Sequence, residues 1–347
     1  MSQTSTTQHG ADLKILRDIF IWLLLVCGLI ANVIGVIVAC LVKVGFPATR
    51  VLLRLQFFWD AMGCIIVAGY WVTFNVNVPS KLANGLAYRY LWSSYFLFMF
   101  GAALSSTNIM LLTVDRFWAV IWFRTYRPES KAYRITLIAV LFGYAIFLAS
   151  PIFITTYYAV NTWRFGIDAL MVSLRVHSIF LFTFAYIFPA TVICVMQLKI
   201  LFLLRRVKSV TGTLPSSTGH ADQLNTNEMD QNVRSASVGI IIVVITFIAA
   251  RFYANFIYIL PNFGVLKIDV ADEWQNAGIF LYAANFLVNP FALLYTSTIV
   301  RKWLSEKCFR FLEPTRRHIS RCLHRQSSKQ ILLEEINPSG DISVYHL

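Results

Sequence analysis

Charged residues are scarce in this chain of 347 residues. Only 14% of the residues are charged, whereas 57% are hydrophobic. A water-soluble domain of this length would need far more polar surface than such a composition supplies. The composition therefore excludes a soluble globular protein and predicts that lipid surrounds most of the chain.

The sequence also lacks the motifs of enzymes and of nucleic-acid-binding proteins. It has no recognisable nucleophile, phosphate-binding loop or metal-ligand cluster, so we expect no enzymatic activity, no cofactor and no metal site. The formal charge of +13 could suit nucleic acid, but no zinc-finger, helix-turn-helix or RNP pattern is present. Because the basic residues flank hydrophobic runs, we expect contacts with anionic membrane lipid and with an acidic protein partner, and none with nucleic acid.

Seven hydrophobic runs are each long enough to cross a membrane as a helix. A helix needs about 20 apolar residues to span about 30 Å of hydrocarbon. The runs lie at residues 19–42, 51–78, 91–114, 135–158, 176–198, 235–260 and 274–300. They predict an all-α protein, folded as a seven-transmembrane helix bundle.

Basic residues are distributed unevenly between the two sides of this bundle. With the N-terminus outside, 22 of the 30 Lys and Arg residues fall on the inner side, seven fall outside, and Arg251 lies within a run. Lys and Arg in short loops stay in the cytoplasm. We therefore expect a multi-pass protein of the plasma membrane with an extracellular N-terminus and a cytoplasmic C-terminus. No cysteine falls in an outer loop, so no extracellular disulfide is expected.

The regions outside the runs are short or polar. We expect an extracellular tail at residues 1–18, a seven-helix domain at 19–300, a juxtamembrane amphipathic helix at 301–312 and a cytoplasmic tail at 313–347. Residues 207–231 are rich in Ser, Thr and Gly, which predicts a flexible third inner loop within the domain. Cys308 in the amphipathic helix is a candidate for palmitoylation.

Polar residues and prolines recur inside the hydrophobic runs, where burial makes polar groups costly. Asp115-Arg116-Phe117 directly follows the third run, and Tyr126 follows in the next loop. The other positions, in chain order, are Asn32, Asp60, Ser105, Pro151, Pro189, Asn285, Asn289 and Pro290. Their types and order resemble those of rhodopsin-like (class A) G-protein-coupled receptors, with Phe117 in place of the family's Tyr.

The resemblance implies a receptor that binds an extracellular ligand and activates a heterotrimeric G protein. In the family, the Arg of the Asp-Arg motif pairs with its neighbouring Asp at rest and turns toward the G protein on activation. This assigns the switch to Arg116 and Asp115, with Phe117 and Tyr126 beside them. Phosphorylated serines of the tail could recruit arrestin-like regulators. Helix kinks are expected at the prolines of the set, Pro151, Pro189 and Pro290.

The sixth run departs most from the family pattern. Arg251 stands where the family has a tryptophan, and Tyr253 stands where it has a proline. A guanidinium near the middle of a membrane needs an anion, so we expect Arg251 to pair with Asp60 in place of the sodium ion that the family binds there. The interior polar network would comprise Asn32, Asp60, Ser105, Arg251, Asn285 and Asn289. Alternatively, Arg251 binds an acidic group of the ligand or extends toward the lipid interface.

The ligand pocket that the resemblance implies is aromatic. We expect it to be lined by Phe98, Met99, Asn255, Tyr258 and Tyr282. Phe98 stands where aminergic receptors have an Asp, which favours a peptide or a lipid-like ligand over a monoamine. The seventh run has no lysine, which excludes a retinal Schiff base. The alternative functions are a receptor-like scaffold that does not signal and, less favoured, a channel or transporter.

Overall fold

The chain divides into two compact units, Met1–Thr298 and Ile299–Leu347. The computed structural model describes residues 3–42, 46–75, 79, 83–211, 220–265, 273–296, 300–303 and 305–306. In the second unit the described residues are helical, and Cys308 and the predicted tail at 313–347 lie outside the described residues. The fold and the sites described below belong to the first unit.

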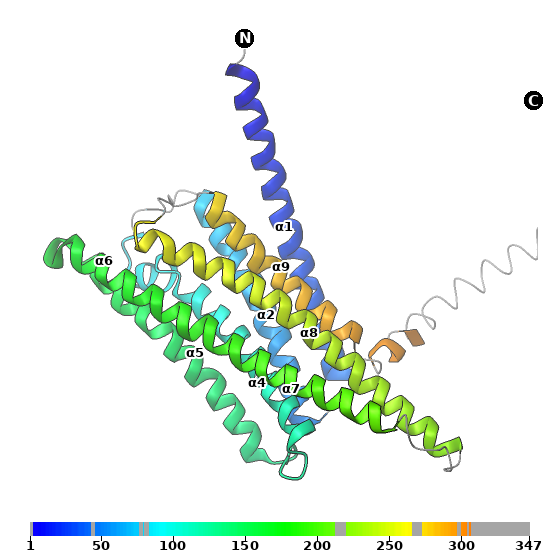
Figure 1. Ribbon diagram of the computed structural model, residues 1–347. Helices are drawn as coiled ribbons and strands as arrows, with labels where there is room; N and C mark the ends of the chain where they lie inside the picture. Colours follow the sequence, from blue (N-terminus) through cyan, green and yellow to red (C-terminus); the bar gives the residue numbers. More distant parts are fainter. Residues whose placement is uncertain are drawn as a thin grey trace, which may run out of the picture. The chain divides into compact units, whose positions relative to one another are not determined.

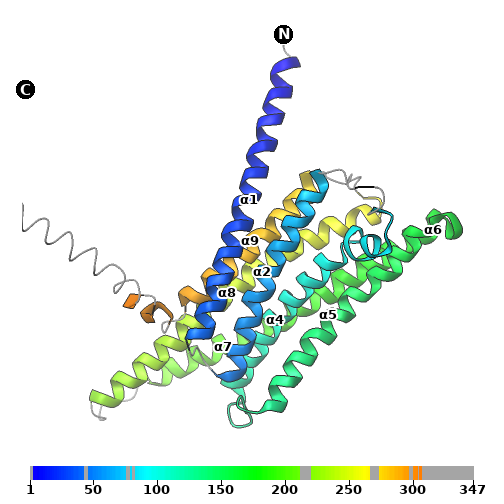
Figure 2. The ribbon, with the colours of Figure 1, turned by 180° about the vertical axis from the view of Figure 1, so that it is seen from behind.

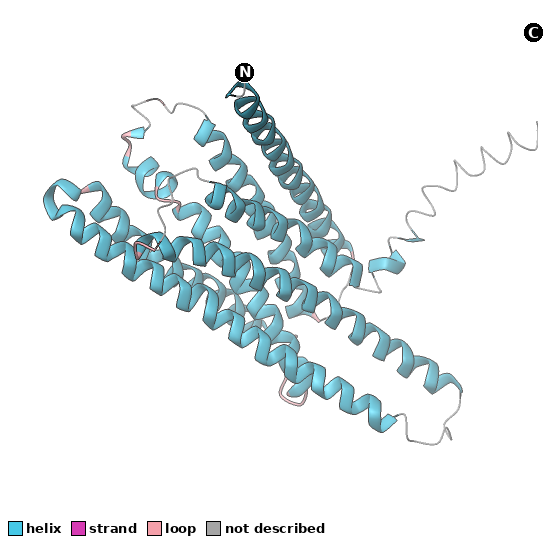
Figure 3. Cartoon of the chain, turned by 45° about the horizontal axis from the view of Figure 1, so that its top comes forward, coloured by secondary structure: helices cyan, strands magenta, loops and turns pink. Residues whose placement is uncertain are grey.

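Helices make up nearly all of the described part of the first unit, in which there is no strand (Figures 1 and 3). The α-helices are α1 (Gln3–Leu41), α2 (Pro47–Asn75), α4 (Phe96–Ile121), α5 (Lys131–Val160), α6 (Thr162–Phe180), α7 (Phe188–Thr211), α8 (His220–Asn262) and α9 (Glu273–Thr296), and the π-helical segments are η1 (Tyr88–Ser93) and η2 (Leu181–Ile187). Seven segments are long and apolar enough to span a membrane, namely Ile15–Leu41, Pro47–Thr73, Phe96–Ile121, Lys131–Val160, Thr162–Leu203, Ile241–Asn262 and Ala277–Leu294. The predicted seven-helix bundle is confirmed.

The third span, α4, is the most buried of the spans. It packs against α2, α5 and α7, and every residue from Gly101 to Thr113 is buried. Helices α1, α2 and α9 pack against one another (Figure 2). Helix α8 packs against α9 and α6. Large apolar side chains such as Ile146, Phe202 and Ile245 remain exposed on the outside, as expected for helices that face lipid.

The connection between the fourth and fifth spans is helical, although the hydrophobic runs predicted a loop from 159 to 175. α5 ends at Val160, and α6 begins at Thr162. Charged residues in this segment interrupt the apolar run, yet the segment is helical on both sides of a kink at Gly166. Gly166 has a φ of 80°, a left-handed conformation that glycine adopts at little cost, and it turns the chain at the start of α6.

Helices also extend into the predicted third inner loop at 207–231. α7 continues to Thr211 and α8 begins at His220, whereas 212–219 lies outside the described residues. All Gly and Pro residues of this loop fall within 212–219, so helices can continue on both sides of it. The flexibility predicted for 207–231 stays a prediction.

The three prolines predicted to kink helices lie in three different spans. Pro151 lies inside α5 and Pro290 lies inside α9. Pro189 is the second residue of α7, one residue after the Phe188 that follows the π-helical segment η2. Because proline has no N–H, it leaves a carbonyl of the preceding turn unpaired, and a wider π-helical turn can accommodate this. The bends themselves stay a prediction.

Candidate functional site

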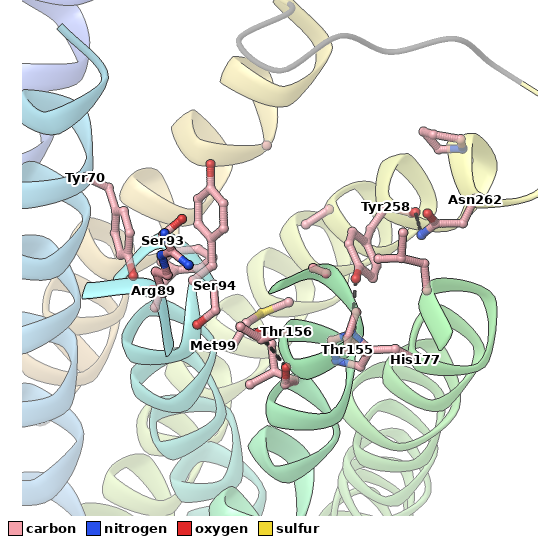
Figure 4. A pocket seen from close by; sticks show the side chains of 18 of the residues that line it. Tyr70, Arg89, Ser93, Ser94, Met99, Thr155, Thr156, His177, Tyr258 and Asn262 are labelled. Atoms are coloured by element: carbon pink, nitrogen blue, oxygen red, sulfur yellow. Dashed lines mark hydrogen bonds between the residues drawn. The ribbon is translucent and has the colours of Figure 1, made fainter. Parts of the chain in front are cut away.

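A cavity of about 990 Å³ lies at one end of the bundle, between α4, α5, α6, α8 and α9 (Figure 4). Its volume is typical of small-molecule sites, which range from about 300 to 1,000 Å³. The lining includes all the residues expected in a ligand pocket, Phe98, Met99, Asn255, Tyr258 and Tyr282. Aliphatic and aromatic side chains dominate the lining, and none of its described residues is acidic.

Stacked aromatic side chains hold the η1 segment against α2 beside this cavity. The ring of Tyr70 stacks on Trp92, with centroids 4.4 Å apart, and on Tyr95, with centroids 5.2 Å apart. The Tyr70 hydroxyl donates to the Trp92 carbonyl at 2.8 Å, and Trp92 Nε1 donates to Thr73 at 3.2 Å. Gly69 leaves room for the indole, because a Cβ there would lie 2.7 Å from it. We call Tyr70, Trp92 and Tyr95 the aromatic clasp.

The opposite wall of the cavity joins α6 to α8. The Tyr258 hydroxyl and His177 Nδ1 are hydrogen bonded at 3.1 Å (Figure 4). Arg175, two residues before His177 in α6, donates from Nε to the carbonyl of Asn262 at 2.9 Å. The sequence did not indicate a role for His177. This residue lies at the edge of the fifth hydrophobic run, and nothing in the sequence pattern pairs it with Tyr258.

Arg251 in α8 lies beneath the cavity and has only 5% of its surface exposed. Its Nη1 donates to the Tyr282 hydroxyl at 2.6 Å, and its Nη2 donates to the Ala102 carbonyl at 2.5 Å and to the Ser106 hydroxyl. The guanidinium also packs over the rings of Tyr282 and Phe247, at 4.6 and 5.7 Å from their centroids. Arg251 thus links α8 to α4 and α9 through neutral groups.

The expected ion pair between Arg251 and Asp60 is not formed. Among the residues whose side chains the structure describes, Arg251 and Asp60 do not come within the distance of an ion pair. Arg251 reaches Ala102 and Ser106 instead, whereas Asp60 is surrounded by other donors. The burial of Arg251 also contradicts the alternative in which it extends toward lipid.

Asp60 in α2 is fully buried and accepts hydrogen bonds from three side chains. Gln56 Nε2 donates to both carboxylate oxygens, at 3.0 and 2.9 Å. Ser105 in α4 donates to Oδ1 at 2.5 Å, and Asn289 in α9 donates to Oδ2 at 2.9 Å. The Gln56 carbonyl oxygen in turn accepts from Asn108 at 2.9 Å. This network ties α2, α4 and α9 together and includes Gln56 and Asn108, which sequence reasoning missed.

The remaining predicted members of the interior network, Asn32 and Asn285, lie on α1 and α9. Asn32 is fully buried and donates from Nδ2 to the carbonyls of Gly28 and Phe286, at 2.8 and 2.9 Å. Asn285 is also buried, and its Oδ1 has no hydrogen-bond donor. The predicted network therefore forms as separate clusters around Asp60, Asn32 and Arg251.

Asp115 near the end of α4 is fully buried among three hydroxyl groups. Its Oδ2 accepts from Thr49 of α2 at 2.6 Å, and its Oδ1 accepts from Tyr126 at 2.9 Å and from Tyr133 of α5 at 3.0 Å. Burial and the negative charge of Asp115 raise the pKa of the Tyr126 phenol, which therefore remains a donor. We call Thr49, Tyr126 and Tyr133 the hydroxyl cage of Asp115.

Arg116, next to Asp115, does not form the resting pair that the resemblance implies. No carboxylate of a described residue lies within ion-pair distance of its guanidinium, and its buried Nε has no acceptor. Phe117 is buried and packs edge-to-face against Trp122, with centroids 5.4 Å apart. Three hydroxyl donors satisfy Asp115, and no described carboxylate pairs with Arg116.

Spacing could have pointed to one of the missed residues. Gln56 lies four residues before Asp60, so the two share one face of α2. Thr49, Ser106 and Tyr133 carry no comparable signal, because their partners lie on other helices. Their contacts depend on the rotation and position of each helix, which the sequence pattern does not specify.

Comparison with known proteins agrees with this arrangement. No curated protein matches the chain significantly. The sequence does match the profile of the family described as 7 transmembrane receptor (rhodopsin family), over residues 31–293. This range, from Ala31 to Leu293, covers most of the chain and contains the cavity, the Asp60 network and Asp115 with its hydroxyl cage. The chain is therefore a multi-pass membrane protein that belongs to the rhodopsin family of seven-transmembrane receptors.

Proposed function

We propose that this receptor converts binding of an extracellular ligand in the cavity into activation of a heterotrimeric G protein. The observation that carries the proposal is the position of both sites on α4. Phe98 and Met99 line the cavity near the start of this helix, and Arg116 lies near its other end. Because α4 is buried against α2, α5 and α7, a shift of the helix at the cavity would be transmitted to the Arg116 end.

The orientation supports this assignment of sites. In a membrane, the strong excess of Lys and Arg on the side of Arg116 favours a cytoplasmic location for this end. The cavity then faces the outside of the cell, and the plasma membrane is the proposed location. Arrestin-like regulators that bind the phosphorylated tail would be further cytoplasmic partners.

The lining of the cavity supports a lipid-like or peptide ligand over a monoamine. A protonated amine is usually bound by a carboxylate, and none of the described lining residues is acidic. The apolar and aromatic walls favour burial of an apolar ligand surface. Arg89 and His177 supply polar groups at the wall.

Arg116 is the proposed contact to the G protein. Its guanidinium is not held by a carboxylate of any described residue, so it can turn toward a partner without breaking an ion pair. Asp115 remains satisfied by its hydroxyl cage when Arg116 moves.

A G-protein dissociation assay in cells, run against a library of lipids and peptides, tests the proposal. Arg116→Ala should abolish the response to any active ligand, because the guanidinium is lost. Arg124→Ala is the matched control, since Arg124 is exposed in the connection after α4. Equal responses in both variants, at equal surface expression, would contradict the proposed role of Arg116. An absence of any ligand response and of basal activity would favour a receptor-like scaffold.

A further inference from the structure

Arg251 is a buried cation with no acidic side chain at ion-pair distance among the residues that the structure describes. Its described acceptors are a carbonyl and two hydroxyl groups, all of them neutral, and its Nε–H makes no hydrogen bond. Asp60 interacts with Arg251 through space, but Gln56, Ser105 and Asn289 occupy its oxygens. A buried guanidinium with neutral partners only is costly, so this site favours the arrival of an anion.

The guanidinium lies at a small cavity that adjoins the large one. Arg251 and Ser106 line a second cavity of about 20 Å³. Met99, Asn255 and Tyr282 line this small cavity as well as the large one. The small cavity has room for a group about the size of a water molecule. A carboxylate is larger than this space, so it could enter only by replacing neutral acceptors of Arg251, while the rest of the ligand stays in the large cavity.

The large cavity favours an apolar body for such a ligand. Its described lining is mostly aliphatic and aromatic, and it contains Arg89 but no acidic residue. An anionic ligand would therefore meet no acidic side chain among the described lining residues of this cavity. A cationic ligand would find no counter-ion among these lining residues.

We propose that the ligand is an amphipathic carboxylate whose acid group binds Arg251. The apolar body fills the large cavity, and the carboxylate enters the small cavity, where it accepts from Nε–H and replaces neutral acceptors of the Nη groups. Arg–carboxylate hydrogen bonds are charge-assisted and often bidentate. The proposal rests on the receptor function proposed above and names the chemical class of its ligand.

Binding of matched acids and amides to the purified receptor in lipid nanodiscs tests this proposal. The probes are dodecanoate, dodecanamide and dodecylamine, with the same three forms of an arylalkyl chain of similar length. At least one carboxylate should bind the wild-type receptor about tenfold more tightly than its amide, the effect expected for one charge-assisted hydrogen bond. The amines should bind no better than the amides.

Variants of Arg251 assign the preference to the guanidinium. Arg251→Gln should bind the acid and the amide equally, and Arg251→Lys should keep a reduced preference for the acid. Arg164→Gln is the matched control, because Arg164 is exposed at the start of α6 and does not line the cavity. Should Arg251→Gln fail to fold, Ser106→Ala provides the test. It removes a neutral acceptor of Arg251 and should preserve or increase the preference for the acid.

Three results would overturn the proposal. The first is equal binding of acids and amides to the wild-type receptor, and the second is a preference that survives in Arg251→Gln. The third is a wild-type receptor that chloride stabilises more than gluconate does and that shows no preference for carboxylates over amides. This result would mean that Arg251 binds a free inorganic ion. Because the readout is binding, these outcomes are independent of whether the receptor activates a G protein.

Discussion

Gln56 donates from one amide nitrogen to both carboxylate oxygens of Asp60, at 3.0 and 2.9 Å. In the family, the acid at the position of Asp60 binds a sodium ion. Here the amide group of Gln56 lies against both oxygens, and Ser105 and Asn289 supply the remaining donors. The sequence had led us to expect that Arg251 would satisfy Asp60. Neutral hydrogen-bond donors satisfy it instead.

Sodium should therefore have no effect on the wild-type receptor. Its unfolding temperature should be the same in sodium chloride and in N-methylglucamine chloride, because no acceptor of Asp60 is left for the ion. Gln56→Leu should cost about 2 kcal/mol of stability, since a buried charge loses hydrogen bonds, and should restore stabilisation by sodium. Sodium-dependent unfolding of the wild-type receptor would contradict the role assigned to Gln56.

The hydroxyl cage of Asp115 predicts a change in basal signalling. In Tyr133→Phe, Oδ1 loses a donor at 3.0 Å and becomes available to Arg116. An ion pair between Arg116 and Asp115 should hold the guanidinium in place and lower the basal rate of G-protein activation. Tyr157→Phe, at an exposed tyrosine of the same helix, is the control and should leave the basal rate unchanged. A higher basal rate in Tyr133→Phe would show that the cage does not keep Arg116 free.

Tyr126 predicts a pH dependence at the alkaline end. Its folded-state pKa is raised above the ordinary value of about 10, so folding favours the protonated phenol. The stabilisation is therefore present below pH of about 10 and is lost only as the pH rises through the raised value. In an ultraviolet titration, the difference between the wild-type receptor and Tyr126→Phe should show no tyrosinate at about pH 10. A phenol that ionises there would mean that the contact with Asp115 is absent.

The packing of the aromatic clasp predicts that one methyl group added at Gly69 lowers the stability of the receptor. Gly69→Ala places a Cβ 2.7 Å from the Trp92 ring, and the resulting overlap should cost about 1–3 kcal/mol. Gly143→Ala is the matched control, because nothing lies within 4 Å of the added methyl group and alanine favours the helix. Thermal unfolding should separate the two variants. Equal stability of both would mean that Trp92 does not pack on α2.

The sequence was sufficient for the architecture because lipid imposes a simple requirement on each span. Hydrophobic length alone located the seven spans, and the resemblance placed Phe98 and Tyr258 at the cavity. The start of the fifth span was wrong, since Arg164 and Asp168 interrupt the apolar run but lie in α6. A helix at the membrane edge can carry charges, so hydropathy underestimates its length.

The partners of the interior polar groups were harder to predict. Arg251 was expected to bind Asp60, yet it binds Ser106 and the Ala102 carbonyl. Both acceptors lie on α4 at positions that have no special pattern in the sequence. A long guanidinium can reach several turns of a neighbouring helix, and helix rotation decides which turn it meets. The contact therefore becomes visible only in the structure.

Nucleotide exchange on a purified G protein tests the proposed receptor function most directly. The receptor in nanodiscs would be mixed with heterotrimers of each class, and GTP analogue uptake would be measured with and without the carboxylate that binds best. We predict that the wild-type receptor and Arg124→Ala accelerate exchange on at least one class, and that Arg116→Ala does not. Exchange at the same rate with Arg116→Ala as with the wild-type receptor would contradict the proposal that Arg116 is the contact to the G protein.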